Sequence, residues 1–177
     1  MRQETKETIW SQFGAAIDAL ENSIRACPES LWSDQNRFHQ LWYMAYHTLF
    51  WLDYYLTENP AEYQPPEPFG LEELDPAGAM PERPYTQAEL LAYLDHGRRK
   101  CRRVIREMTH EKAAGIFPMG RKELTHAELL LYNMRHVQHH TAQLNLLLRQ
   151  EIDSAPRWSF QSKLGLDGSG DRPEARD

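Results

Sequence analysis

The sequence predicts an all-α protein built as one four-helix bundle, and three observations support this prediction. Four segments carry apolar residues at the three- and four-residue spacing of an amphipathic helix. No stretch shows the period-two alternation of a half-buried strand. The length of 177 residues is enough for one domain with a sizeable core. We expect the bundle over residues 1–156 and a tail over residues 157–177.

The first two helices are separated by a short break. The first is predicted from about Thr5 to Ala26, because Pro28 then stops it. The second is predicted from roughly Arg37 to Thr57, with Asp34 or Asn36 as its cap. It is apolar on most sides, so we expect it to be central and well buried.

A proline-rich segment follows the second helix. Seven of the eleven prolines lie in residues 58–85, which excludes a helix or a central strand there. A disordered linker between two domains is one reading, but each flanking part is too short for a packed domain. We therefore interpret the segment as a long irregular crossover between the second and third helices. Its apolar residues, which we expect to hold it to the surface, are Phe69, Leu71, Leu74 and Tyr85.

Two capping boxes open the remaining helices. Thr86–Glu89 begins the third helix, which is predicted to end at about Thr109. Thr125–Glu128 begins the fourth helix, which is predicted to end at about Glu151. The intervening Gly115–Gly120 is predicted to be a loop. Beyond the fourth helix, four apolar residues favour docking on the bundle or on a partner chain, so a homodimer is one expectation: Trp158, Phe160, Leu164 and Leu166.

Composition excludes several classes of partner. The net charge is −6 and no basic cluster is present, so nucleic acid is not expected as the main partner. The most apolar stretch, Leu41–Leu56, contains His47 and Asp53 and is too short and polar to span a bilayer. Cys27 and Cys101 show no paired-motif spacing, and the charged N-terminus lacks a signal core. We expect a soluble, cytoplasmic protein with free thiols.

The fourth helix carries a pattern typical of metal binding. His136 and His140 are four residues apart, so their rings lie one above the other on the same side of the helix. Two imidazoles at this spacing can share one metal ion. Asn133 and Gln143 lie on the same side, whereas His139 is turned about 100° away from His140. A solvated polar face is the alternative, but it is disfavoured by the apolar residues Val137, Leu144 and Leu147.

A third ligand must come from another helix. Among the other histidines, only His47 and His96 lie well inside a helix, because His39, His110 and His126 are near helix ends. His47 is about ten residues, or ~15 Å, from either end of its helix, so it reaches the middle layer in either helix direction. It shares a face with Trp51 and Tyr54, whereas His96 lies on a polar side. The alternative role for His47 is a hydrogen-bonded core residue.

These residues resemble a known family. The mid-helix sequence Tyr46–Trp51, together with His-x-x-x-His-x-x-Gln over 136–143, is similar to the DinB-like superfamily, the DinB/YfiT type of four-helix-bundle metalloenzymes. The resemblance extends over about Thr5–Glu151 and departs from the family at Ala142, where Gly is common. It implies an up-down-down-up topology, which suits the long crossover.

The resemblance also implies a chemistry. It implies a divalent metal ion, variously zinc, nickel, iron or manganese, on His47, His136 and His140, with waters completing the shell. It implies members that transfer or isomerise low-molecular-weight thiol conjugates, so a thiol co-substrate is expected, alongside members without a known reaction.

Three neutral imidazoles leave positions open on the ion, as in catalytic rather than structural sites. Two classes of function remain: a metal-dependent hydrolase or thiol S-transferase with a small-molecule substrate, and a non-catalytic metal-binding or stress-response protein. No catalytic residue is identified. The expected lining of a substrate pocket, for which core packing is the alternative, is Trp51, Tyr54, Tyr132 and Gln143, with Trp10 as a further aromatic candidate.

Charged residues of the bundle have two readings each. Asp18 and Asp95 could support the ligands or act as bases. Arg98 could hold an anionic substrate or pair with an acid on a neighbouring helix.

Overall fold

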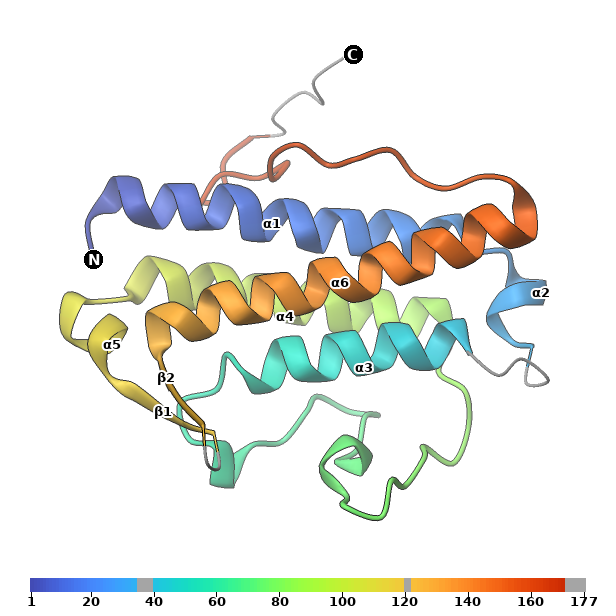
Figure 1. The fold of residues 1–177 in the computed structure, drawn as a ribbon, viewed down its shortest axis with the longest axis horizontal. Helices are drawn as coiled ribbons and strands as arrows, with labels where there is room; N and C mark the ends of the chain where they lie inside the picture. Colours follow the sequence, from blue (N-terminus) through green and yellow to red (C-terminus); the bar gives the residue numbers. More distant parts are fainter. Residues whose placement is uncertain (35–39, 120–121, 171–177) are drawn as a thin grey trace.

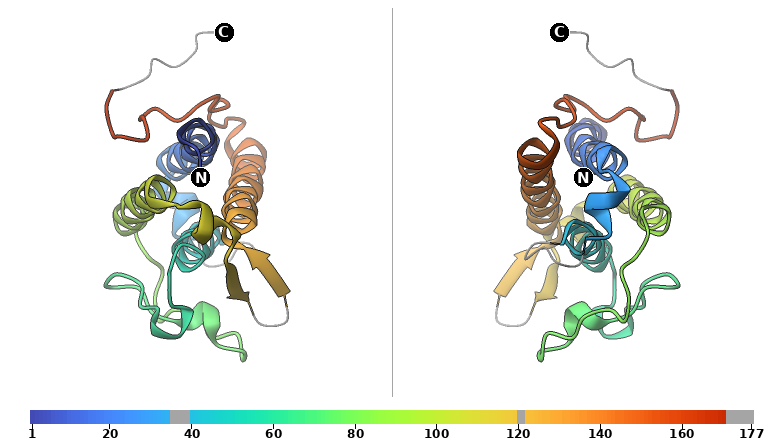
Figure 2. Two further views of the ribbon diagram at one scale, coloured as in Figure 1. Left: turned by 90° about the vertical axis from the view of Figure 1, so that its left-hand side faces the viewer. Right: turned by 90° about the vertical axis from the view of Figure 1, so that its right-hand side faces the viewer.

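The computed structural model describes residues 1–34, 40–119 and 122–170, and most of these are helical. Two pairs of long helices make up the body of the protein (Figures 1 and 2): α1 Gln3–Ala26, α3 Leu41–Tyr54, α4 Gln87–Glu107 and α6 His126–Ile152. Both α1 and α3 pack against both α4 and α6. Within the described ranges, no helix combines the length and apolar character needed to cross a bilayer.

The long helices run in two directions. In Figure 1, α1 and α6 run from left to right, and α3 and α4 run from right to left. Two hydrogen bonds show that α1 and α4 are antiparallel. Lys6 near the start of α1 donates to Arg106 O near the end of α4, whereas Gln87 at the start of α4 donates to Ile24 O near the end of α1. A buried amide joins the other antiparallel pair, since Asn133 Nδ2 of α6 donates to the carbonyl oxygen of Leu52 in α3.

Local sequence signals predict most helix ends. Both capping boxes are confirmed, with the side chains of Thr86 and Thr125 accepting from the backbone N–H three residues on. Helix α3 has Gln40 as its N-cap, so Asp34 does not cap it. The other cap candidate, Asn36, and the predicted start at Arg37 lie outside the described residues. The short helices α2 Glu29–Trp32 and α5 His110–Ala114 were not predicted.

The segment between α5 and α6 contains a β-hairpin where a loop was predicted. Strands β1 Ile116–Met119 and β2 Lys122–Thr125 pair antiparallel, so the prediction of a loop was wrong for Ile116–Met119. Each strand has only four residues, too few to produce a clear alternating pattern. Burial stabilises the hairpin, because Phe117 is fully buried in a small cluster with Tyr55 of the α3 C-cap and Leu129 of α6.

The crossover between α3 and α4 is irregular, as predicted, with two short 3₁₀ turns, η1 Pro60–Glu62 and η2 Glu72–Leu74. Aromatic packing holds it against the helices. The Phe69 ring stacks on Tyr93 of α4 with a centroid separation of 4.3 Å, and Tyr85 is buried. Leu71 and Leu74, by contrast, remain exposed.

The segment after α6 returns along α1 (Figure 1). Trp10 Nε1 donates to the carbonyl oxygen of Leu164 at 2.8 Å, and Leu166 is buried. Trp10 therefore packs in the core and holds the tail. Trp158 and Phe160 are 72% and 66% exposed, so their rings do not pack in the core, although Phe160 O accepts a hydrogen bond from Gln12 Nε2 of α1.

A buried ionic cluster joins α3, α4 and the crossover. Asp53 is 1% exposed and lies 2.5 Å from Lys100 Nζ, while it accepts a hydrogen bond from the Tyr63 hydroxyl at 2.9 Å. His96 Nε2 lies 3.4 Å from the same carboxylate. Burial alone raises the pKa of Asp53, but the hydrogen bond from His96 and the contacts of Lys100 and Tyr63 outweigh it. The pKa is therefore below its usual value.

This lowered pKa predicts a specific acid sensitivity. The unfolded carboxyl titrates near 3.9, so its contribution to stability is complete above that pH and is lost as the pH falls through the lower folded-state pKa. We expect the free energy of unfolding to fall with pH in this window, by at most about 1.4 kcal/mol per pH unit for this one group. Urea unfolding of the wild type and Asp53→Asn between pH 5 and 2 measures it. Identical slopes for the two proteins would contradict the prediction.

Candidate metal centre

Two helices position three imidazoles at one point. His47 lies in the middle of α3, and His136 and His140 lie one turn apart in the middle of α6. The ring centroid of His47 lies 5.3 Å from that of His136 and 4.8 Å from that of His140. The ring centroids of His136 and His140 are 4.5 Å apart. One nitrogen from each ring lies within 4.8 Å of the others, and all three residues are half-buried. The structure therefore brings together the three residues predicted as ligands.

Hydrogen bonds orient two of the three rings. His47 Nδ1 donates to Glu73 Oε2 at 2.7 Å, and His140 Nδ1 donates to Gln143 Oε1 at 2.7 Å. Because each Nδ1 carries its hydrogen toward an acceptor, the Nε2 atom of each ring keeps its lone pair. His136 Nε2 lies 3.4 Å from His47 Nε2, so the ε nitrogens converge.

Burial favours the neutral form of two of the three imidazoles, those of His136 and His140. It lowers the pKa of His136 to about 3, with a further contribution from repulsion by the neighbouring His140 and His47. Burial also lowers the pKa of His140, against the opposing effect of its hydrogen bond to Gln143. Neutral imidazole is the form that binds a metal ion.

The donor set fits a divalent ion. Two ligands at about 2.1 Å from a tetrahedral ion are about 3.4 Å apart, which matches the separation between the ε nitrogens of His47 and His136. Imidazole nitrogens suit zinc, nickel and iron. Three such donors would leave at least one position of a four-coordinate ion open. The His136 Nδ1 atom is buried and has no hydrogen-bond partner among the described residues, so no hydrogen bond at Nδ1 orients this ring.

Glu73 is a residue of the site that the sequence did not predict. It comes from η2 in the crossover, and its side chain is only 5% exposed. Burial alone raises the pKa of its carboxyl, but hydrogen bonds, led by the one from His47, outweigh burial and hold the pKa below the usual value. The sequence of the crossover has no periodic signal that indicates which of its acids turns inward.

The acids proposed from sequence lie elsewhere. Asp18 accepts from Arg98 at 2.9 Å, and Arg98 also pairs with Glu21 of α1, so this arginine is bound to acids of a neighbouring helix. Asp95 is exposed and pairs with Arg99 one turn along α4. Neither aspartate is a partner of the three histidines in the described interactions.

The residues predicted to line a pocket differ in their distance from the cluster. Trp51 and Gln143 are closest, because Trp51 lies 6.3 Å from His47 between ring centroids and Gln143 bonds directly to His140. Tyr132 is further from the histidines, because the Tyr55 ring lies between them: Tyr132 contacts Tyr55, and the Tyr55 ring centroid lies 6.2 Å from that of His136. Tyr54 packs with Trp51, Tyr55 and Phe117 as part of the core. A role in substrate binding stays a prediction for all four.

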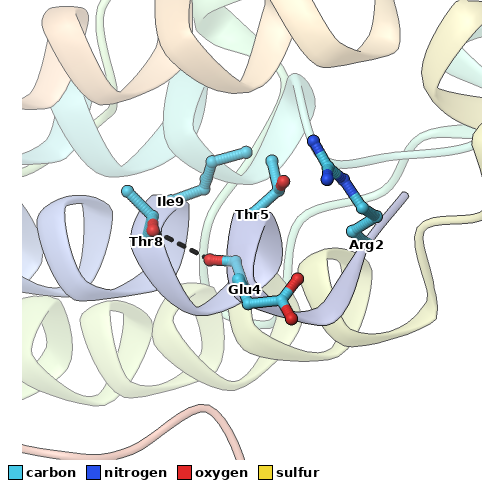
Figure 3. Close-up of a pocket in the computed structure, with 5 residues that line it drawn as sticks. All are labelled: Arg2, Glu4, Thr5, Thr8 and Ile9. Atoms are coloured by element: carbon cyan, nitrogen blue, oxygen red, sulfur yellow. Dashed lines mark hydrogen bonds between the residues drawn. The ribbon is translucent and has the colours of Figure 1, made fainter.

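A surface hollow lies away from this cluster. It has a volume of about 390 Å³ and lies over the first turns of α1, where Arg2, Glu4, Thr5, Thr8 and Ile9 line it (Figure 3). Helix α1 contributes no histidine to the cluster, and the Thr8 hydroxyl is occupied by a hydrogen bond to Glu4 O. The hollow therefore offers no chemistry comparable to that of the histidines.

The remaining histidines are not part of the cluster in the described residues. His139 is exposed, as its position on the helix predicts. His96 belongs to the Asp53 cluster. His39 lies outside the described residues.

Comparison with protein families identifies the chain. A family model described as the DinB superfamily matches residues 12–144, which include all of α3 and the first two thirds of α6. The match covers the three clustered histidines and Gln143. Comparisons with curated proteins and with solved structures find no match. Since the family model matches most of the length of the chain, the chain belongs to the DinB superfamily.

Proposed function

We propose that this protein is a divalent-metal-dependent enzyme that uses His47, His136 and His140 as its metal ligands. The convergence of three imidazole nitrogens from two helices carries the proposal. When bound, a divalent ion such as zinc, nickel, iron or manganese would lower the pKa of a water or a low-molecular-weight thiol and so provide a nucleophile. We also propose an up-down-down-up four-helix bundle as the scaffold.

The residues around the histidines have supporting roles in this proposal. Glu73 and Gln143 hold two imidazoles by their Nδ1 atoms, which leaves the Nε2 atoms for the metal. The rings of Trp51 and Tyr55 flank the cluster and limit the access of water. The side chain of His47 is 29% exposed, so a small substrate can approach it.

A reaction screen tests the proposal and separates its two forms. Protein loaded with zinc, nickel, iron or manganese is incubated with small electrophiles, with and without low-molecular-weight thiols. Turnover that requires a thiol and is lost in His47→Ala supports an S-transferase, whereas thiol-independent cleavage supports a hydrolase. No turnover by fully loaded protein across the panel would contradict the enzyme proposal and favour a metal-binding protein without catalytic activity.

A further inference from the structure

We infer that Glu73 is a positioning residue for the metal centre: its carboxylate fixes the tautomer and direction of the His47 ring and connects the crossover to the site. The inference rests on the proposed function, because it gives Glu73 a role toward the ion that the histidines would hold. It concerns a segment of the chain, η2, that lies outside the long helices and carries none of the clustered histidines.

The geometry around one carboxylate oxygen carries the argument. Glu73 Oε2 accepts from His47 Nδ1 at 2.7 Å and from Trp51 Nε1 at 2.8 Å. His47 and Trp51 are four residues apart, so both donors project from the same face of α3. A carboxylate can only accept here, and His47 must therefore carry its hydrogen on Nδ1 and present the lone pair of Nε2 to α6. Glu73 thus selects the tautomer that a metal ligand needs.

Charge gives a second reason. The Glu73 side chain is 5% exposed, and its Oε1 atom is buried without a hydrogen-bond partner among the described residues. A buried carboxylate depends on its hydrogen bonds and on nearby positive charge. A divalent ion on the opposite side of the His47 ring would place positive charge one imidazole away from this carboxylate. The carboxylate in turn makes the imidazole a more basic ligand.

The adjacent Glu72 allows a test that distinguishes positioning of the His47 ring from simple anchoring of the crossover. Glu72 lies in the same 3₁₀ turn, and its Oε2 atom accepts from the Tyr46 hydroxyl of α3 at 3.0 Å. Both glutamates therefore attach the crossover to α3, but only Glu73 contacts one of the clustered histidines. Glu72→Gln is a matched control, because it removes an equivalent charge from the same turn without affecting the His47 hydrogen bond.

Zinc affinity is the first test, measured by competition with a chelator. Loss of a carboxylate bonded to a metal-binding histidine typically weakens metal binding 10- to 100-fold, and we expect this loss for Glu73→Gln. We expect Glu72→Gln to bind zinc as the wild type does. Equal affinity of wild type and Glu73→Gln would overturn the inference while the proposed site stands. A wild type that does not bind zinc, nickel, iron or manganese would instead overturn the proposed function.

The His47 tautomer is the second test and needs no metal. Long-range ¹⁵N–¹H spectra of the metal-free protein at pH 8 report which ring nitrogen carries the hydrogen. We expect Nδ1–H in the wild type and in Glu72→Gln, with a shift toward Nε2–H in Glu73→Ala. A role confined to anchoring the crossover would leave the tautomer unchanged. Wild-type His47 protonated on Nε2 would overturn the inference, even if the Glu73 variants did not fold.

Discussion

Replacing His140 with alanine is expected to weaken zinc binding by more than about 100-fold, because loss of a direct ligand should exceed the 10- to 100-fold effect typical of residues behind the ligands. The His140 ring lies 4.8 Å from His47 and 4.5 Å from His136 between centroids, and Gln143 orients its Nδ1 atom away from them. Chelator competition measures the affinity. Thermal melting gives a second readout, because zinc at 1,000 times its Kd stabilises the folded form by about 4 kcal/mol.

The neighbouring histidine is the matched control. His139 is exposed on the same helix, and it does not belong to the group of ligand atoms that converge. We expect His139→Ala to keep the zinc affinity and the zinc-dependent rise in melting temperature of the wild type. Similar losses in His139→Ala and His140→Ala would show that the wrong face of α6 was assigned. His47→Ala should lose zinc as His140→Ala does, since His47 is the one ligand proposed from α3.

The Asp53→Asn substitution is expected to lower the free energy of unfolding by about 3–5 kcal/mol, the usual result of breaking a buried ion pair from one side. Lys100 Nζ lies 2.5 Å from the carboxylate and also donates to the backbone oxygen of Asp53. Its side chain is 15% exposed, so the substitution leaves a largely buried ammonium without its counter-charge. Urea unfolding near pH 7 with circular dichroism measures the effect.

A second aspartate provides the comparison. Asp95 of α4 also pairs with a cation, Arg99, but both side chains are more than half exposed. Exposed pairs contribute about 0.2–1 kcal/mol, so Asp95→Asn should have little effect. A loss of less than about 1 kcal/mol in Asp53→Asn would mean that Lys100 is solvated by water or moves out to solvent, and would contradict the prediction. Zinc affinity should be retained in both variants, because neither aspartate is a partner of the clustered histidines in the described interactions.

Sequence alone was sufficient where the physical cause is local. The capping boxes at Thr86 and Thr125 each depend on residues three positions apart, and the structure contains both. The proximity of the His136 and His140 rings follows from the period of one helix. The depth of His47 within its helix restricted it to the middle layer of any bundle, where the structure places it beside the other two. The same residues supported the family resemblance that the family comparison confirms.

Tertiary structure decided several contacts between segments that are distant in the chain. Glu73 meets His47 across 26 residues, and Lys100 meets Asp53 across 47, through the path of an irregular crossover and the parallel packing of α3 on α4. Neither contact has a periodic signature, because loops and helix faces adopt the orientation that buries the most apolar surface and pairs the buried charges. The β-hairpin likewise forms because its two strands pair and because Phe117 is buried. Strands of four residues are too short for their own sequence to predict this pairing.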